Sequence, residues 1–260
     1  MNNKVVATQA PQGVAVIPPE WQGKMAKYAQ AASATERPKS SFFSTKSGVL
    51  SYGEQPIPNN TMEVVVVGAM HENTWYSKPF DAGTPRTPDC YAMSLNGVHM
   101  APHPDAPNKQ ATSCDDCPKG KWDRSIAGKN VPPPCKPNRR LACLSAGALG
   151  DPANVASGTV GLLRIPVTSI KNYSSHVQTC AAHGLPPWAV VTEVKVVPDA
   201  RTQFQVVFRF VAPISNVTLL DALEVRQALE QVNIIQPYPV LDADQAAAQD
   251  AATAAAPRKF

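Results

Sequence analysis

Glu63-Val64-Val65-Val66-Val67 is the stretch of sequence that decides the fold. β-Branched side chains favour extended backbone, and an apolar run without polar alternation is typical of a strand that is buried on both faces. We therefore expect a central strand here. Residues 40–52 have the composition of a β-rich segment that ends at Gly53, and a second strand is predicted after the valine run from three aromatic residues, Trp75, Tyr76 and Phe80.

The second half of the chain predicts two helices and a β-hairpin. Apolar residues recur at helical spacing between Pro166 and Gly184, which indicates an amphipathic helix with a glycine C-cap. Residues 188–197 and 203–211 are expected to form two strands of a hairpin. Residues 216–235 predict a C-terminal helix, capped by Ser215 or Asn216. The apolar stripe of the first helix consists of Ile170, Tyr173, Val177 and Cys180. In the strand over 203–211, the side chains that alternate onto one face are Phe204, Val206, Phe208 and Phe210.

Composition places the chain among globular proteins, because 260 residues with 43% hydrophobic content can bury a core. The 24 Lys and Arg against 20 Asp and Glu give a net charge of only +4, which excludes a histone-like DNA packager. Both ends of the sequence are rich in Ala, Pro and polar residues. We expect a flexible N-terminal arm over 1–40, a core over 41–235 and a flexible Ala-rich tail over 236–260.

The sequence contains neither a signal-peptide pattern nor a run of about 18 apolar residues. This favours a cytoplasmic protein without a membrane partner. Six cysteines are present. In a reducing compartment, clustered cysteines are more often metal ligands than disulfides.

Cys114-Asp115-Asp116-Cys117 is a Cys-x-x-Cys turn, which delivers two thiolates to a metal from one tight knuckle. Two isolated cysteines flank it in the order C-x23-C-x2-C-x17-C. Residues 81–140 show no apolar periodicity, so a bound metal would supply the ordering energy that hydrophobic burial cannot. We predict one structural Zn²⁺ in an insertion at about 85–143, held by Cys90, Cys114, Cys117 and Cys135.

Other interpretations of these cysteines stay open. They could be buried free thiols or a redox pair, and His99 or His103 could replace one thiolate. No His-x-Glu or His-Glu-x-x-His pattern accompanies them, so a closed structural site is favoured over a catalytic one. Cys143 and Cys180 are expected in the core.

The strongest local charge lies between Lys119 and Arg140, where Asp123 is the only acidic residue. Such a patch attracts phosphate backbones, and Trp122 within it would give a base a stacking surface. A four-thiolate zinc centre would neutralise part of this charge, and solvated surface or a protein interface are the alternatives. The predicted nucleic-acid-binding residues are Lys119, Lys121, Trp122, Arg124, Lys129, Lys136, Arg139 and Arg140, joined by Lys78, Trp75 and Tyr76.

Five short motifs resemble a family of tailed-phage, zinc-containing, single-stranded-DNA-binding proteins. They are Ser47-Gly48-Val49-Leu50-Ser51-Tyr52-Gly53, Pro88-Asp89-Cys90-Tyr91, Cys114-x-x-Cys117-Pro118, Cys135-x3-Arg139-Arg140 and Ile165-Pro166-Val167-Thr168-Ser169-Ile170-Lys171. The resemblance covers about residues 40–212. It implies an OB-like barrel with a zinc-bearing insertion that binds displaced single strands during replication or recombination, without sequence preference. The acidic tail common in such proteins is missing, so tail-mediated recruitment is not expected.

The sequence thus predicts an α+β, mainly β fold, with an OB-like barrel core, a zinc-binding insertion, an amphipathic helix, a β-hairpin and a C-terminal helix. The leading functional hypothesis is a non-enzymatic single-stranded-DNA-binding protein without a small-molecule substrate. The alternative is a transcription or replication accessory protein that uses its zinc segment to bind a polymerase. A nuclease would have His71-Glu72 and Asp81 as its best candidates, which we interpret as loop residues.

Overall fold

The structure is a computed structural model, and it describes residues 42–53, 55–78, 87–124 and 130–235. These residues belong to one compact unit, Ser41–Phe260. The predicted arm at 1–40 and tail at 236–260 lie outside the described residues, and so do Phe80, Asp81 and Lys129.

The longest strand, β4 (Thr61–Trp75), is formed around the valine run and lies in the middle of the sheet. Its side chains from Val64 to Val67 are at most 3% exposed. One edge of β4 pairs with β6 (Lys136–Ser145), and the other edge pairs with β8 (Val190–Asp199) and β5 (Cys90–Ser94). The prediction of a central strand is therefore confirmed. The separate second strand predicted from Trp75 is wrong, because β4 continues without interruption through that residue.

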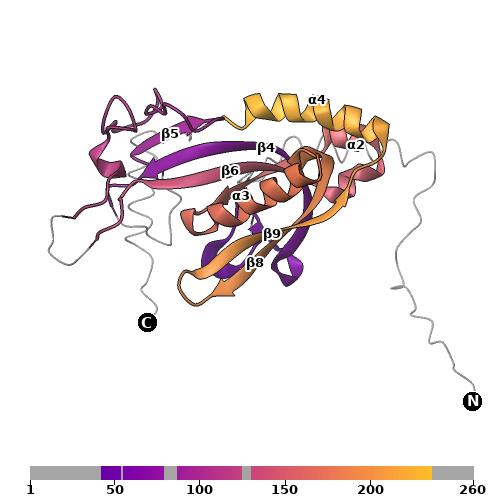
Figure 1. The fold of residues 1–260 in the computed structure, drawn as a ribbon, viewed down its shortest axis with the longest axis horizontal. Coiled ribbons are helices and arrows are strands. Elements are labelled where there is room, and N and C mark those ends of the chain that lie inside the picture. The colour runs from indigo at the N-terminus through magenta and orange to yellow at the C-terminus, as the bar shows by residue number, and fades with distance from the viewer. Residues whose placement is uncertain (1–41, 54, 79–86, 125–129, 236–260) are drawn as a thin grey trace, which may run out of the picture. The chain divides into compact units, whose positions relative to one another are not determined.

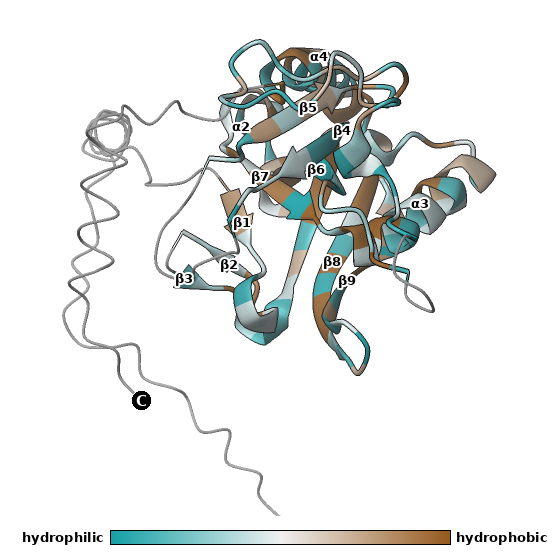
Figure 2. Ribbon diagram, turned by 90° about the vertical axis from the view of Figure 1, so that its left-hand side faces the viewer, coloured by the Kyte–Doolittle hydropathy of each residue, from teal (hydrophilic) through white to brown (hydrophobic). Residues whose placement is uncertain are grey.

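A single mixed sheet holds the strands together in the order β3-β2-β1-β7-β6-β4-β8-β9, with β5 added beside β4. Neighbours are antiparallel except for β1 and β7, which are parallel. The sheet curls into a half-barrel (Figure 2). The remaining strands are β1 (Phe42–Ser44), β2 (Ser51–Tyr52), β3 (Gln55–Pro56), β7 (Val160–Ile165) and β9 (Gln203–Pro213).

Helices cover both faces of the central strands (Figure 1), which is why the valine run has no polar alternation. Helix α3 (Val167–Ala182) packs through Tyr173 onto one core cluster with Val64 and Val66. Helices α2 (Pro152–Ser157) and α4 (Val217–Asn233) pack onto the opposite cluster, which holds Val65 and Val67. The mixed α+β, mainly β class predicted from the sequence is therefore confirmed.

The predicted helices and hairpin are confirmed, and their ends follow local chemistry. Helix α3 is followed by Gly184, whose φ of 71° is the left-handed conformation that glycine adopts without a steric cost. Asn216 caps α4, because its side-chain oxygen accepts a hydrogen bond from the Leu219 amide at 3.2 Å. In the turn between β8 and β9, the Asp199 carboxylate accepts from the backbone amides of Arg201 and Thr202.

The expectation of no hydrophobic order between residues 81 and 140 is wrong. Strand β6 begins inside this range, and the loop after β5 has a small core of its own, in which Tyr91, Met100 and Ala106 are buried. The Tyr91 and His103 rings stack with centroids 5.1 Å apart. Short 3₁₀ helices complete the chain: η1 (Lys46–Gly48), η2 (Pro58–Asn60), η3 (Pro118–Gly120), η4 (Ala146–Gly150) and η5 (Pro187–Ala189). Within the described ranges, no helix is long and apolar enough to cross a membrane.

Candidate metal and nucleic-acid site

The two isolated cysteines lie on either side of the end of β4. Cys90 is the first residue of β5 and pairs directly with Trp75, the last residue of β4. Cys135 comes immediately before β6, whose first residue, Lys136, pairs with Thr74. The sheet therefore places two thiols from distant parts of the sequence around the same strand end.

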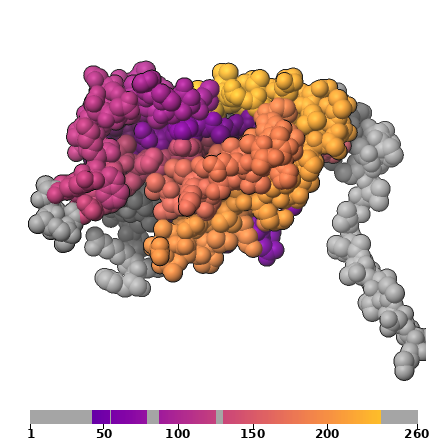
Figure 3. Space-filling model, in the orientation of Figure 1, coloured from indigo at the N-terminus to yellow at the C-terminus, as the bar shows by residue number. Residues whose placement is uncertain are grey.

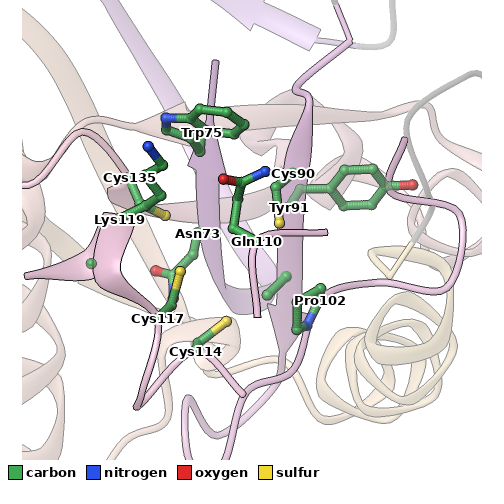
Figure 4. A pocket seen from close by; sticks show the side chains of 12 residues that line it. Asn73, Trp75, Cys90, Tyr91, Pro102, Gln110, Cys114, Cys117, Lys119 and Cys135 are labelled. Carbon is green, nitrogen blue, oxygen red and sulfur yellow. The ribbon is translucent and has the colours of Figure 1, made fainter. Parts of the chain in front are cut away.

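The Cys-x-x-Cys turn is folded over this strand end by backbone hydrogen bonds. The Cys114 amide donates to the Met100 carbonyl at 2.9 Å, and the Cys117 amide donates to the Cys114 carbonyl at 3.3 Å. The Cys135 amide donates to the Lys119 carbonyl at 2.9 Å, which ties the loop to the start of β6. As a result all four predicted ligands line one pocket (Figure 4). The sequence order alone could not show this convergence.

The electrostatics of the pocket favour protonated thiols in the absence of a cation. Burial raises the pKa of the Cys90 and Cys114 thiols above the ordinary value, and it raises the pKa of the Cys135 thiol to about 12. The other cysteines of the pocket contribute to the same upward shift. A bound divalent cation would reverse this preference, because it stabilises thiolates directly.

The donor set of the pocket fits zinc. Four thiols at one pocket are the ligands of a closed structural zinc centre. Among the described residues, no three Cys, His, Asp or Glu side chains are already arranged to hold a metal ion. A bound zinc would fix the loop against β4, and the sulfurs of Cys90, Cys114, Cys117 and Cys135 would hold the ion.

The two histidines considered as substitutes do not line this pocket. His99 has an 89% exposed side chain, with Nδ1 3.9 Å from an Asp115 carboxylate oxygen. His103 stacks on Tyr91, and its Nδ1 accepts a hydrogen bond from the Asp105 amide at 3.2 Å. The four-cysteine set is therefore the better candidate of the two.

The predicted nucleic-acid-binding residues differ in their exposure and in their place relative to the cysteine pocket. The Lys119 ammonium lies 5.1 Å from the centre of the Trp75 ring, and both residues line the pocket. Trp122 is 56% exposed, between exposed Lys121 and Arg124. Of the other predicted residues, Lys136 and Lys78 are exposed, Tyr76 and Arg139 are half-buried, and Lys129 lies outside the described part of the chain.

Arg140 was predicted as a nucleic-acid contact, and the structure contradicts this. Its side chain is 1% exposed and forms an ion pair with Glu72, which is fully buried. Arg164 Nε lies 2.8 Å from the second oxygen of the same carboxylate, and Arg140 also donates to the Ile234 carbonyl at 3.2 Å. Arg140 therefore joins the sheet to the end of α4 and cannot reach a phosphate in solvent. Side chains alternate along β6, so its neighbour Arg139 points to the opposite face.

Two further predictions about this region are corrected or extended. His71 and Glu72 lie inside β4, not in a loop as interpreted from the sequence. The sequence reasoning also missed Asn73 and Gln110, which line the cysteine pocket. Asn73 donates to the Met100 sulfur at 3.7 Å. A single amide in a strand or loop carries no pattern that would have marked it.

Comparisons with protein-family models, with curated proteins and with solved structures found no match for this chain. What the fold and the site define is a mixed, mainly β protein with a curled sheet and a four-cysteine pocket under a basic, Trp-bearing loop.

Proposed function

We propose that this protein binds single-stranded DNA without sequence preference and without catalysis, through the loop end of the sheet. One observation carries the proposal: the four cysteines converge at the strand end where Lys119 lies over Trp75, and Trp122, three residues after Lys119, is exposed. A metal at this point would fix the loop that presents the basic and aromatic groups. Bases stack on aromatic rings and phosphates pair with Lys and Arg, a combination that suits single strands.

The proposal extends to the finer features that the family resemblance implies. In this proposal the half-barrel supports the single DNA strand, as an OB-like barrel core would. One structural zinc stabilises the insertion at about 85–143. The protein would act in phage DNA replication or recombination, in the cytoplasm of the host cell. The described helices and strands are compatible with this assignment, and the experiments below test it.

DNA binding is tested by titrating the protein with oligo-dT and following Trp fluorescence. We expect quenching that weakens as salt increases, because phosphate contacts release counterions. Trp122→Ala should weaken binding about tenfold, because stacking one base contributes about 1–3 kcal/mol. Lys121→Ala should reduce the salt dependence, whereas Lys195→Ala, a matched change at an exposed position on β8, should not. Absence of quenching, or a preference for duplex DNA, contradicts the proposal.

The zinc is tested by metal analysis of the purified protein. We expect about one equivalent, lost in Cys117→Ser and retained in Cys180→Ala, because Cys180 is buried at the core side of α3. Removing the metal with a chelator should release the loop and expose its backbone to proteolysis. A metal-free protein with an intact loop would refute the zinc assignment.

A protein partner is the second candidate function, and one observation favours it. The outer side of α4 carries apolar side chains at helical spacing: Val225 is 72%, Leu229 52% and Val232 74% exposed. An accessory protein for replication or transcription would bury such a stripe against a polymerase. Co-purification with a polymerase that survives nuclease treatment and is lost in Val225→Asp would support this function over DNA binding alone.

A further inference from the structure

The central strand β4 has a gap in its pairing. On one edge, β8 pairs with residues 61–64 and β5 pairs with residues 71–75. Between them, residues 65–70 have no strand partner on this edge among the described residues. Every second residue of a strand directs its N–H and C=O to the same edge, so about half of these backbone groups face the gap. The gap corresponds to roughly 20 Å of extended chain.

A cavity of about 240 Å³ lies at this gap. Its lining comes from β4, from the loop after β5, from η5 and from the two helices α3 and α4. In the space-filling view, part of β4 is visible between α4 above and α3 below (Figure 3). The lining residues are Val66, Val67, Gly68, Ala69, Leu95, Tyr173, Pro187, Trp188, Gln227 and Gln231.

The chemistry of the lining is neutral. It consists of apolar side chains, two aromatic rings, two glutamine amides and the backbone of the strand. None of the described residues that line the cavity is charged, so nothing in the lining would neutralise a phosphate. Val67 belongs to the lining and its residue is fully buried, and backbone polar groups at a buried position need a hydrogen-bonding partner. An extended peptide backbone supplies alternating donors and acceptors at the spacing of a strand edge.

We infer that this gap is a binding site for an extended, uncharged peptide segment of a partner protein, which adds to β4 as a missing strand. β5 and β8 both run antiparallel to β4 on this edge. The peptide therefore runs antiparallel to β4 too, in line with both strands. The cavity is slightly smaller than the roughly 300 Å³ at which drug-sized ligand pockets begin. It buries one or two peptide residues, between Trp188 and Leu95, and the rest lie along the rim.

The site stands apart from the proposed DNA-binding function. It shares no lining residue with the cysteine pocket. It does not require zinc, and its failure would leave the DNA-binding proposal untouched.

The first experiment selects binding peptides from a displayed library of random seven-residue sequences on the full protein, and the best selected peptide is then the probe. Leu95→Arg should weaken its binding at least about tenfold, because it places a charge at the mouth of the cavity. Val98→Arg is the matched control: Val98 is an exposed apolar residue of the same loop but not of the lining, and binding should be unchanged. Gln231→Lys, at an exposed lining position on α4, repeats the test from the opposite side.

The second experiment asks whether the peptide pairs as a strand. Alternate amides of an extended peptide point to opposite edges, and only one edge faces β4. N-methylation of the amides that face β4 should abolish binding, and N-methylation of the other amides should leave binding unchanged. Hydrogen exchange of the amides at residues 65–70 that face the gap should slow when the probe is added. Failure to select any peptide, equal binding by Leu95→Arg and Val98→Arg, or no alternation on N-methylation overturns the inference. If oligo-dT displaced the probe peptide, the cavity would be assigned to a nucleobase. If these amides were already protected from hydrogen exchange in the free protein, the cavity would be assigned to another segment of this chain.

Discussion

Neutralising Glu72 should destabilise the protein strongly, because this carboxylate holds two arginines. Glu72 is fully buried, Arg140 is 1% exposed, and the Arg164 side chain is 29% exposed. Glu72→Gln keeps the shape of the side chain but removes the negative charge that faces the buried Arg140 guanidinium. Breaking a buried ion pair by removing one partner costs about 3–5 kcal/mol. Total stabilities of single domains are about 5–15 kcal/mol, so the loss should be a large fraction of the whole.

Urea denaturation measures this effect directly. We expect Glu72→Gln to lower the free energy of unfolding by about 3 kcal/mol with an unchanged dependence on urea concentration. Glu193→Gln is the control, because Glu193 pairs with Arg209, whose side chain is 62% exposed, and ion pairs in solvent contribute little to stability. A Glu72→Gln protein as stable as the Glu193→Gln protein would refute the assignment of Arg140 to the core, and Arg140 would return to the list of DNA contacts.

Two further perturbations follow from single side chains. Burial lowers the pKa of His176 below its ordinary value of 6.5. Below about pH 6.5 the unfolded chain therefore binds more protons than the native protein, and stability should fall as pH falls through this range. His176→Gln should flatten this dependence in urea denaturation curves recorded between pH 7 and pH 5, whereas a matched change at His183, exposed after the same helix, should leave it steep. Gly97 has a φ of 71°, and a Cβ added there would overlap the imidazole ring of His71. Gly97→Ala should cost about 1–3 kcal/mol of unfolding free energy, whereas Gly150→Ala, which meets nothing within 4 Å, should cost less; equal losses would contradict the close contact.

Much of the fold could be predicted from local pattern. The valine run, the helix stripe ending at Gly184 and the alternation between Phe204 and Phe210 each report which faces of an element are buried, and the structure confirms all three elements. Such patterns repeat within a few residues, so they can be identified without knowing the neighbours.

Strand β6 escaped prediction for a physical reason. Its first half, which includes Lys136, Pro137 and Asn138, has a composition typical of a loop. The apolar run in its second half, Leu141-Ala142-Cys143-Leu144, is too short to indicate a strand by itself. Its strand conformation comes from ten residues of pairing with β4, a partner distant in the sequence. The same pairing places Arg140 beside Glu72, so the role of that arginine could not be deduced from its basic neighbours.

The sequence by itself determined the candidate metal ligands, because two thiols at Cys-x-x-Cys spacing can bind the same metal ion whatever the surrounding tertiary structure. Only the tertiary structure decided that Cys90 and Cys135 join that turn, since the register of β5 and β6 on β4 brings them to one strand end. It also decided which basic side chains face solvent and where β4 is left without a partner. These properties depend on strand register and helix packing, which join residues that no local pattern links.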